Sequence, residues 1–435
     1  MYLLYSSIYI IVLIFILPFE YFKRPGHIRK RWLKEKFGFL NTDFFKSPHP
    51  PFTKGGQGGI IWVHAVSVGE VMASLPLLKR LREKYPSKNI ILSTITDTGQ
   101  KVARERVPEG TGVVYLPFDI TPVITAAIKK VKPVILIIIE TELWPNLIRS
   151  FRKNGTPVIL LNGRISENSF RGYKRISFFM KRVLSHIDFF GMQGEEYAER
   201  IRNLGVNTGK VMNTGNFKFD SSPPSQIPVW TEKIKGPVIA AGSTHEGEEE
   251  FITSVYHELK KDSPLLNLVI APRHPERFKG VEDMLRLKGI SFIKRSAFSN
   301  QLPESTIVQG QIILLDTVGE LSAIYGISDI AIIGKSFRGY GGQNPLEPAY
   351  WGKPIVCGPH MENFPVIRDF YTEGAAIEAR EDELYSVLKG LLLSPGKAGE
   401  IGSKAQELYR KNAGAVERAM EIVEKYINVI NVQIS

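Results

Sequence analysis

The sequence predicts an α/β fold with two similar domains, because three features of the chain agree. Its 435 residues exceed what one hydrophobic core normally organises, so two domains of about 200 residues are the natural division. Short runs rich in Ile, Val and Leu alternate with helical patterns, which is typical of βαβ units and parallel sheets. The Pro- and Ser-rich stretch 221–236 separates two such regions and is predicted to be the interdomain linker.

The amino-acid composition limits which class of protein this chain belongs to and which partners it binds. The chain is 43% hydrophobic and 23% charged, as in ordinary globular proteins. Its formal net charge of +12 indicates an anionic partner. Nucleic acid is not expected, because no zinc-finger or RNP-type signature is present. Cys357 is the single cysteine, which excludes an internal disulfide and is typical of a small buried residue. Without Cys/His metal spacing, no metal site and no cofactor are expected.

Residues 1–22 are predicted to be an N-terminal membrane anchor. The segment from Tyr2 to Phe19 is uncharged, and as a helix it would be about 27 Å long, enough to span a hydrocarbon core. Basic residues follow at once, so the positive-inside rule places the remaining chain in the cytoplasm. A signal peptide is not indicated, because a basic n-region and a small-residue cleavage site are missing. The alternative is an interfacial helix that lies on the membrane.

Residues 23–59 form a basic juxtamembrane segment followed by a Pro/Gly-rich linker. Lysines and arginines with Trp32 and Phe37 between them are expected to face anionic headgroups, at about 1 kcal/mol for each cation. The same cations could contact a phosphorylated lipid substrate. Residues 46–59 lack periodicity, and their glycines precede a strand instead of following one, which argues against a nucleotide-binding loop.

The first domain is predicted over residues 60–220, and Glu70 is its central candidate. Glu70 follows an apolar strand at 60–66 and lies in the first turn of a helix at 71–85. Ser67 and Glu70 have capping-box spacing, so one interpretation is purely structural. The other is a general base, since a helix N-terminus should keep this carboxylate ionised at neutral pH.

Two further charged residues at strand ends are candidates in this domain. Glu140 follows the very apolar strand 134–139, and it could share a site with Glu70 or simply begin the next helix. Lys218, near the domain's end, is either a site residue or an ordinary surface lysine. The segment 164–182 mixes cations with aromatic rings, which suits either a solvated face or a surface for an acceptor or lipid headgroup.

The second domain is predicted over residues 237–415, and residues 416–435 are predicted to be a C-terminal helix. Four polar motifs follow its strands, and each is weak alone, but together they indicate a nucleotide. These motifs are Gly242–Glu246, Ala271–Pro275, Asp316–Glu320 and Gly334–Ala349. Two similar domains joined by a linker lead us to expect a cleft between facing strand ends. The strands expected across both domains are 60–66, 90–95, 112–117, 134–139, 157–161, 187–192, 237–241, 266–271, 311–315, 328–333 and 354–357.

Six motifs, in the same order along the chain, resemble those of 3-deoxy-D-manno-octulosonic acid (Kdo) transferases. They are His64–Glu70, Glu140–Asn146, Asn162–Ser166, Gly215–Asp220, Ala271–Phe278 and Gly341–Ala349. The resemblance covers nearly the whole chain except the insert at 46–59. It implies a GT-B glycosyltransferase with two Rossmann-like domains at a central cleft, on the cytoplasmic side of the inner membrane. It also implies a CMP-Kdo donor, a tetraacyldisaccharide 4′-phosphate lipid A precursor as acceptor, inversion of configuration and no metal.

The resemblance assigns roles residue by residue. Glu70 would be the general base, and Glu140 and Lys218 would stabilise the transition state beside it. The residues that would hold CMP are Pro272, Arg273, Val318, Gly319, Glu320, Asn344, Pro345, Leu346 and Glu347. Two alternatives are a GT-B transferase or epimerase that uses a UDP-sugar, and a non-catalytic membrane-anchored binding protein.

Overall fold

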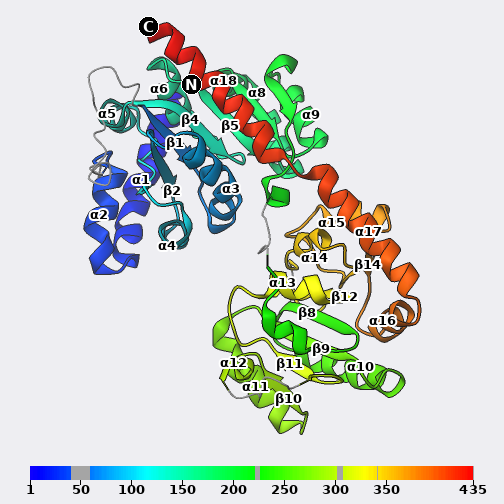
Figure 1. The fold of residues 1–435 in the computed structure, drawn as a ribbon. Helices are drawn as coiled ribbons and strands as arrows, with labels where there is room; N and C mark the ends of the chain where they lie inside the picture. The colour runs from blue at the N-terminus through cyan, green and yellow to red at the C-terminus, as the bar shows by residue number, and fades with distance from the viewer. Residues whose placement is uncertain (41–58, 221–225, 301–306, 340, 435) are drawn as a thin grey trace. The chain divides into compact units, whose positions relative to one another are not determined.

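The computed structural model describes residues 1–40, 59–220, 226–300, 307–339 and 341–434. Most of the Pro/Gly-rich insert and the start of the predicted linker therefore lie outside the described residues. The chain divides into two compact units (Figure 1). The first unit contains residues 1–221 and 413–435, and the second contains residues 222–412.

The first unit is built on a parallel seven-stranded sheet in the order β3-β2-β1-β4-β5-β6-β7. Because all pairs are parallel, the carboxyl ends of the strands share one edge, and the strand order reverses between β1 and β4. The strands are β1 (Ile60–His64), β2 (Asn89–Thr94), β3 (Thr111–Tyr115), β4 (Pro133–Ile139), β5 (Val158–Gly163), β6 (Phe189–Met192) and β7 (Val211–Asn213).

Helices cover both faces of this sheet, which explains why its central strands are apolar throughout. In β4, Leu136 and Ile138 pack into one core cluster, whereas Ile135, Ile137 and Ile139 pack into the other. This alternation is the two-residue period of a strand. The helices are α3 (Val68–Lys84), α4 (Asp97–Arg106), α5 (Thr121–Val131), α6 (Pro145–Lys153), α7 (Glu167–Arg175), α8 (Ser177–Leu184) and α9 (Glu195–Asn203).

The C-terminal helix α18 (Ala415–Ile434) belongs to the first unit although it follows the whole second unit in sequence (Figure 1). Asp220 fixes its start, because its carboxylate accepts hydrogen bonds from Gly414 N at 2.6 Å and Val416 N at 2.5 Å. Further along, Val423 is fully buried in the core cluster that contains Leu77 of α3.

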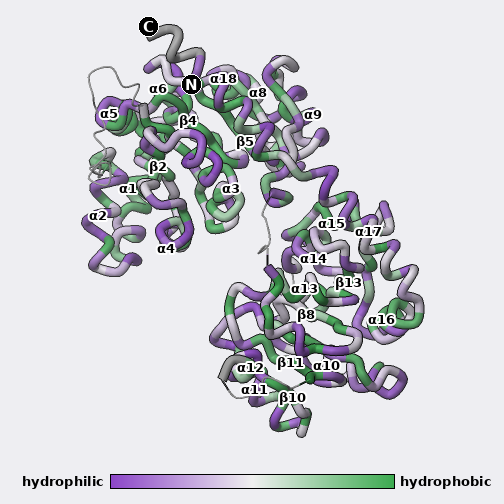
Figure 2. Tube along the Cα trace, viewed as in Figure 1, coloured by the Kyte–Doolittle hydropathy of each residue, from purple (hydrophilic) through white to green (hydrophobic). Residues whose placement is uncertain are grey.

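The second unit repeats the design, with a parallel seven-stranded sheet in the order β10-β11-β9-β8-β12-β13-β14. Its central strands are the apolar ones, as the hydropathy colouring shows (Figure 2), and Cys357 is fully buried as expected. The strands are β8 (Val238–Thr244), β9 (Asn267–Pro272), β10 (Phe292–Lys294), β11 (Ile312–Leu314), β12 (Ile330–Ile333), β13 (Ile355–Cys357) and β14 (Ala376–Glu378). The helices are α10 (Glu248–Asp262), α11 (Phe278–Leu287), α12 (Ala297–Asn300), α13 (Leu321–Ile327), α14 (Leu346–Tyr350), α15 (Ile367–Thr372), α16 (Leu384–Leu393) and α17 (Pro395–Asn412).

The N-terminus forms two helices, α1 (Tyr2–Lys23) and α2 (Gly26–Lys36). By length and composition α1 could cross a membrane, with a mean hydropathy of 2.2 over its most apolar window, so it is compatible with an anchor. One side of α1 is hydrogen-bonded to the first unit. The Tyr5 hydroxyl donates to the Asp119 carboxylate at 2.7 Å, and Asn146 Nδ2 donates to the Ser6 hydroxyl at 3.0 Å.

Three strands, β7, β10 and β14, were not expected from the sequence. Each has three residues and lies at an outer edge of its sheet. Edge strands are half-exposed and short, so they lack the apolar run that identifies a central strand.

Candidate active site

Glu70 is held in place by a capping box at the carboxyl end of β1. The Ser67 hydroxyl accepts a hydrogen bond from Glu70 N at 3.4 Å, and the Glu70 carboxylate accepts one from Val66 N at 2.6 Å. The Ser67 hydroxyl also lies 3.2 Å from the other carboxylate oxygen. Ser67 caps the helix as the structural interpretation expects, but the carboxylate returns to Val66 N and not to the cap residue's own N–H. The same contacts fix the carboxylate at the sheet edge where α/β folds bind ligands.

The ionisation of Glu70 differs from the sequence-based expectation. Its side chain is buried, and this burial is the main reason that its pKa rises to about 7. The hydrogen bond from Val66 N opposes the rise, whereas the charges of Glu140 and Glu142 add to it. The favourable field of a helix N-terminus is worth about 0.3–1 kcal/mol at an exposed site, so burial and like charge outweigh it here. Near neutral pH, Glu70 is thus divided between its two protonation states.

Glu140, Lys218 and Arg164 form a charge cluster at the same edge. Burial raises the pKa of Glu140, and the charges of Lys218 and Arg164 oppose that rise. Burial lowers the pKa of Lys218, while Glu140 raises it. The structure therefore brings Glu70, Glu140 and Lys218, which the sequence reasoning singled out, into one electrostatic group.

Neighbouring loops hold this cluster through backbone contacts. Arg164 N donates to the Thr141 hydroxyl at 3.0 Å, and that hydroxyl donates to Arg164 O at 2.7 Å, which joins the loops after β4 and β5. Phe217 N donates to Asn162 Oδ1 at 3.0 Å and so fixes the turn that carries Lys218. Glu140 and Asn162 both have a positive φ, of 60° and 55°. Such strain is costly for non-glycine residues and concentrates at functional sites.

Asn162 is a site residue that reasoning from individual residues did not single out. It is fully buried, and its Nδ2 has no hydrogen-bond partner within the described part of the chain. The available signal was its position directly after an apolar strand, inside one of the six family motifs.

In the second unit, three of the proposed donor residues lie together. Asn344 Nδ2 donates to a Glu347 carboxylate oxygen at 3.3 Å. Burial raises the pKa of Glu347, and the Asn344 hydrogen bond and the charge of Arg273 oppose the rise. Arg273 follows Pro272, the last residue of β9. Arg273, Asn344 and Glu347 thus form one polar group at the carboxyl edge of the second sheet.

Pro345 and Leu346 contribute differently from these three. Pro345 caps the short helix α14, and the Leu346 side chain is buried at 2% exposure. Leu346 N already donates to Asn344 Oδ1 at 3.1 Å. These two residues position Asn344 and Glu347 and present no free polar side chain of their own.

The turn from Val318 to Glu320 stands apart from this group. The Glu320 carboxylate accepts hydrogen bonds from Arg295 at 2.9 Å and from Trp230 Nε1 at 3.1 Å, so it is engaged inside the unit. Val318 is 69% exposed, and Gly319 has a φ of 94°. Among the residues that the structure describes, no hydrogen bond or ion pair joins this turn to Arg273, Asn344 or Glu347.

Glu248, in the first turn of α10, connects two loops. Its fully buried carboxylate accepts hydrogen bonds from His245 N at 2.9 Å, Lys335 N at 2.7 Å and Phe337 N at 3.1 Å. These amides belong to the loops after β8 and β12, the neighbouring strands between which the second sheet's order reverses. Spacing along one helix gives no signal for such a contact between distant segments.

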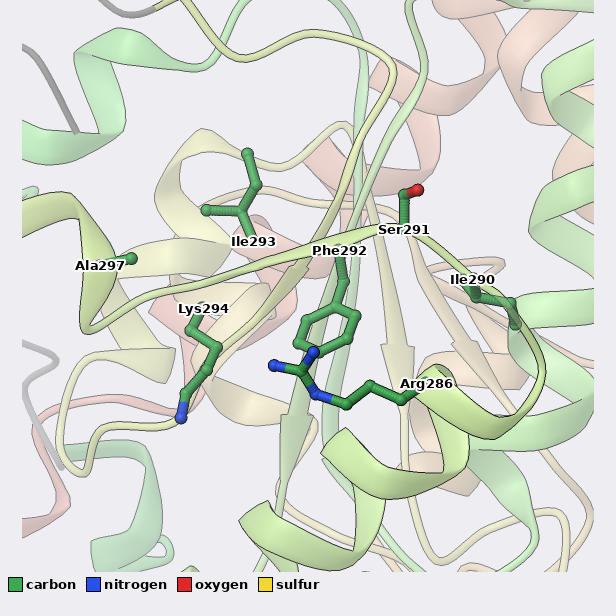
Figure 3. A pocket seen from close by; sticks show the side chains of 7 residues that line it. All are labelled: Arg286, Ile290, Ser291, Phe292, Ile293, Lys294 and Ala297. Atoms are coloured by element: carbon green, nitrogen blue, oxygen red, sulfur yellow. The ribbon is translucent and has the colours of Figure 1, made fainter. Parts of the chain in front are cut away.

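A separate hollow of about 390 Å³ lies beside the outer strand β10 (Figure 3). The Arg286 guanidinium lies 5.4 Å from the centre of the Phe292 ring there. None of the proposed donor residues lines this hollow, so we do not assign the donor site to it. Across the described ranges, no group of three or more His, Cys, Asp or Glu side chains is arranged to hold a metal ion.

Comparison with solved structures identifies the fold. The chain is similar to a UDP-GlcNAc 2-epimerase from Neisseria meningitidis bound to UDP-GlcNAc, with a TM-score of 0.56 and 13% identity over 84% of this chain and 100% of that one. It is also similar to the calicheamicin glycosyltransferase CalG4, with a TM-score of 0.52 and 13% identity over 86% of this chain and 100% of that one. These similarities, with the two parallel sheets, define a GT-B fold.

Sequence comparison identifies the family. A family model described as 3-deoxy-D-manno-octulosonic-acid transferase (kdotransferase) matches residues 31–221. A 3-deoxy-D-manno-octulosonic acid transferase from Haemophilus influenzae is 34% identical over 406 residues, which cover 91% of this chain and 91% of the relative. The chain belongs to the Kdo transferase family and is an enzyme of the glycosyltransferase type in lipopolysaccharide biosynthesis. The family assignment favours this activity over a UDP-sugar enzyme or a non-catalytic binding protein.

Proposed function

We propose that the enzyme transfers Kdo from CMP-Kdo to a hydroxyl of a tetraacyldisaccharide 4′-phosphate lipid A precursor, with inversion and without a metal ion. The observation that carries this proposal is the position of Glu70. Its carboxylate is fixed at the carboxyl end of β1, beside Glu140 and Lys218, with a pKa of about 7. A general base is most effective when its pKa lies near the working pH.

The proposed reaction is a direct displacement at the anomeric carbon of Kdo. The acceptor hydroxyl loses its proton to Glu70 as its oxygen bonds to the anomeric carbon of Kdo. The bond between that carbon and the CMP phosphate oxygen breaks, and its electron pair leaves with CMP. Attack opposite the leaving group inverts the anomeric centre. Proton uptake neutralises Glu70, and this relieves its repulsion with Glu140 and Glu142.

The cations of the charge cluster suit the anionic donor. Lys218 and Arg164 lie near the partly buried Glu140 carboxylate and oppose the rise in its pKa. In the same surroundings they would stabilise negative charge that develops on the reacting groups. Glu140 would hold Lys218 in its charged form, because it raises the pKa that burial lowers.

The second unit would supply the contacts to CMP. We propose that Arg273 pairs with the phosphate, since a guanidinium matches phosphate oxygens in geometry and charge. Glu347 would accept hydrogen bonds from the ribose hydroxyls, and Asn344 would orient it through their 3.3 Å contact. Pro272 would fix the start of the Arg273 loop. Because the Glu320 carboxylate is already hydrogen-bonded to Arg295, the 318–320 turn would contact CMP through its backbone groups.

The proposed membrane attachment rests on α1 and on the basic residues that follow it. We propose that the protein is held at the inner membrane, with both units on the cytoplasmic side. The apolar side chains on the outer side of α1 are largely exposed, for example Leu3 at 85% and Phe15 at 79%. This face would contact lipid, and the following lysines and arginines would contact anionic headgroups.

Glu70→Gln tests the proposed base. Glutamine keeps an oxygen that can accept from Val66 N, so we expect a folded variant that melts no lower than the wild type at neutral pH, but a turnover lower by about 10²–10⁴-fold. The matched control is Glu83→Gln, a half-exposed position on the same helix that pairs with Arg80. Turnover would be measured as CMP release with CMP-Kdo and the lipid acceptor. Near-normal turnover of folded Glu70→Gln protein would overturn the assignment.

A further inference from the structure

A pocket of about 180 Å³ lies between α1, α2 and the carboxyl edge of the first sheet. Its walls are mainly apolar and aromatic, but Arg24, Lys36 and the acid Glu20 also line it. Among the side chains that line it are Leu13, Leu17, Trp32, Lys36, Phe118 and Trp144. The proposed donor and catalytic residues do not line this pocket, which we call the α1–α2 pocket.

The α1–α2 pocket adjoins the candidate active site within one unit. Its inner wall comes from residues that follow β2, β3 and β4, on the same sheet edge as Glu70. Trp144 forms part of that wall, two residues after Glu142, whose charge raises the pKa of Glu70. A ligand in this pocket would therefore lie at the same sheet edge as the proposed base.

Lys36 gives the pocket an unusual charge. Its side chain is buried at 7% exposure, and its ammonium lies 5.5 Å from the centre of the Phe118 ring. Burial and then the charge of Arg24 lower its pKa to about 8, although the carboxylates of Asp97, Glu20 and Glu35 oppose that change. Within the described ranges, no side chain or carbonyl accepts a hydrogen bond from this ammonium, and no carboxylate pairs with it. A buried cation needs a partner, so this position favours an anionic group on a ligand.

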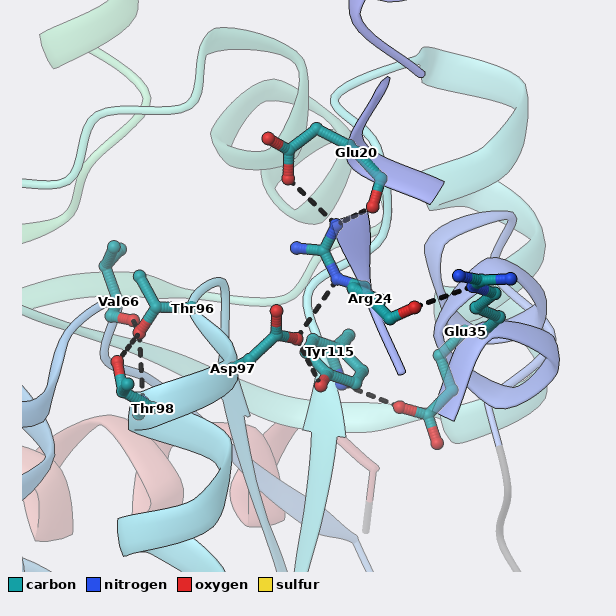
Figure 4. A network of polar contacts seen from close by, with 10 residues as sticks. Glu20, Arg24, Glu35, Val66, Thr96, Asp97, Thr98 and Tyr115 are labelled. Carbon is teal, nitrogen blue, oxygen red and sulfur yellow. Dashed lines mark hydrogen bonds and ion pairs between the residues drawn. The ribbon is translucent and has the colours of Figure 1, made fainter. Parts of the chain in front are cut away.

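The second cation, Arg24, already forms ion pairs with carboxylates of the protein and makes up part of the pocket's wall. Its guanidinium lies 4.1 Å from the Trp32 ring centre and pairs with Asp97 at 3.1 Å and Glu20 at 2.8 Å (Figure 4). The Tyr115 hydroxyl also donates to Asp97, at 2.7 Å. This network joins the end of α1 to the loop after β2, so the pocket has a built wall on this side.

The outer side of the pocket is continuous with the exposed apolar face of α1. Ile16 lines the pocket and is still 48% exposed, next to Phe15 at 79%. An apolar cavity of about 150 Å³ holds a benzene molecule. The α1–α2 pocket could thus hold a short length of hydrocarbon chain that enters from the lipid side.

We propose that the α1–α2 pocket binds part of one acyl chain of the acceptor lipid, with Lys36 facing an anionic oxygen of that lipid. The inference rests on the proposed lipid acceptor and adds a subsite to it. Chain and charge together would align the acceptor so that its hydroxyl reaches Glu70. Bulk membrane lipid is the competing occupant, and it would give the pocket no influence on acceptor selection.

Leu13→Trp tests this proposal by filling the pocket, and Ile14→Trp is its matched control. Ile14 carries the same kind of side chain on the same helix, but it is 63% exposed and does not line the pocket. With the fully acylated acceptor in detergent, we expect Leu13→Trp to raise KM about tenfold, and Ile14→Trp to leave it unchanged. With an O-deacylated acceptor, both variants should match the wild type. Equal effects of Leu13→Trp on both acceptors would overturn the proposal.

A binding measurement separates this inference from the proposed reaction. Photoreactive dodecyl phosphate would be crosslinked to the full-length enzyme, and the labelled peptides would be identified by mass spectrometry. We expect labelling of α1 and of residues 116–118 that Leu13→Trp reduces and that Ile14→Trp keeps. Lys36→Met should remove the preference for dodecyl phosphate over photoreactive dodecanol. Undiminished labelling in a folded Leu13→Trp or Leu17→Trp variant would refute the pocket, whether or not the enzyme transfers Kdo.

Discussion

Glu70 and Glu140 follow β1 and β4, the two neighbouring strands between which the order of the first sheet reverses, and the charge of Glu140 raises the pKa of Glu70. Ligands of α/β folds bind outside the carboxyl ends of strands at such a switch point. The relationship explains how a capping-box residue can also serve chemistry. Its backbone contacts fix the carboxylate, and the neighbouring acid adjusts its affinity for a proton.

The pH profile of the reaction should report Glu70. A base acts only when ionised, so we expect kcat/KM to fall below a pKa of about 7. Glu140→Gln removes a like charge and should shift this acidic limb to lower pH, in addition to any loss of turnover. Rates between about pH 5.5 and 8.5 would be compared for both proteins. Identical acidic limbs would contradict the coupling of the two carboxylates.

Stability should also depend on the proton of Glu70. Its folded pKa of about 7 lies above the ordinary value of 4.5, so the folded protein holds a proton that the unfolded chain releases. This contribution to the free energy of unfolding is fully present below about pH 4.5 and is lost as pH rises to about 7. The free energy of unfolding of Glu70→Gln minus that of the wild type should be larger at pH 7.5 than at pH 4.5, by roughly 1–3 kcal/mol. Urea unfolding at both pH values would measure this, and a constant difference would refute it.

Two glycine substitutions in the second unit should have opposite effects. A Cβ on Gly334 would lie 2.4 Å from Ser243 O and 2.6 Å from Thr244 Cα, which are backbone atoms that cannot turn aside. We expect Gly334→Ala to lower the free energy of unfolding by about 1–3 kcal/mol. Gly399 lies in α17 with nothing within 4 Å of the added atom, so Gly399→Ala should raise it by roughly 0.5–1 kcal/mol. Chemical denaturation of the two variants would measure both changes. If both variants lose stability, the loss at Gly334 is not specific to its close approach to the backbone of Ser243 and Thr244.

The attachment of α1 to the first unit can be tested at Tyr5. Tyr5→Phe removes the hydroxyl that donates to the Asp119 carboxylate at 2.7 Å. A hydrogen bond to a charged group contributes about 1.5–3 kcal/mol, so hydrogen exchange in α1 should become at least tenfold faster. Tyr21→Phe is the control, because the Tyr21 ring packs against Phe22 within the same helix. Equal exchange in the two variants would show that the Tyr5 hydrogen bond does not contribute to holding α1.

The sequence was informative where one local pattern decides the structure. The alternation of strands and helices predicts both sheets, since a fully buried strand such as β4 must be apolar on both faces. Glu70 was found because its cap and helix are adjacent in sequence. The role of Glu248 was not predictable, because its partner Lys335 lies 87 residues away. Likewise, periodicity alone cannot assign α18 to the unit that the chain left at Asp220.

Glu248 provides a final prediction, because one buried carboxylate holds two loops at the switch point of the second sheet. Glu248→Ala leaves the amides of His245, Lys335 and Phe337 without this acceptor. The contact of the Phe337 amide is buried and the other two are partly buried. An unsatisfied buried donor costs about 1–3 kcal/mol, so the variant should unfold at a clearly lower denaturant concentration. The control is Glu250→Ala on the same helix, where the acid is exposed and pairs with Lys288.

We also expect weaker stabilisation by CMP in Glu248→Ala, measured as a smaller thermal shift, because Arg273 N donates to Thr244 O at the end of the strand before this loop. If Glu248→Ala keeps wild-type stability, the two loops are held by other contacts and the assigned role of Glu248 is wrong.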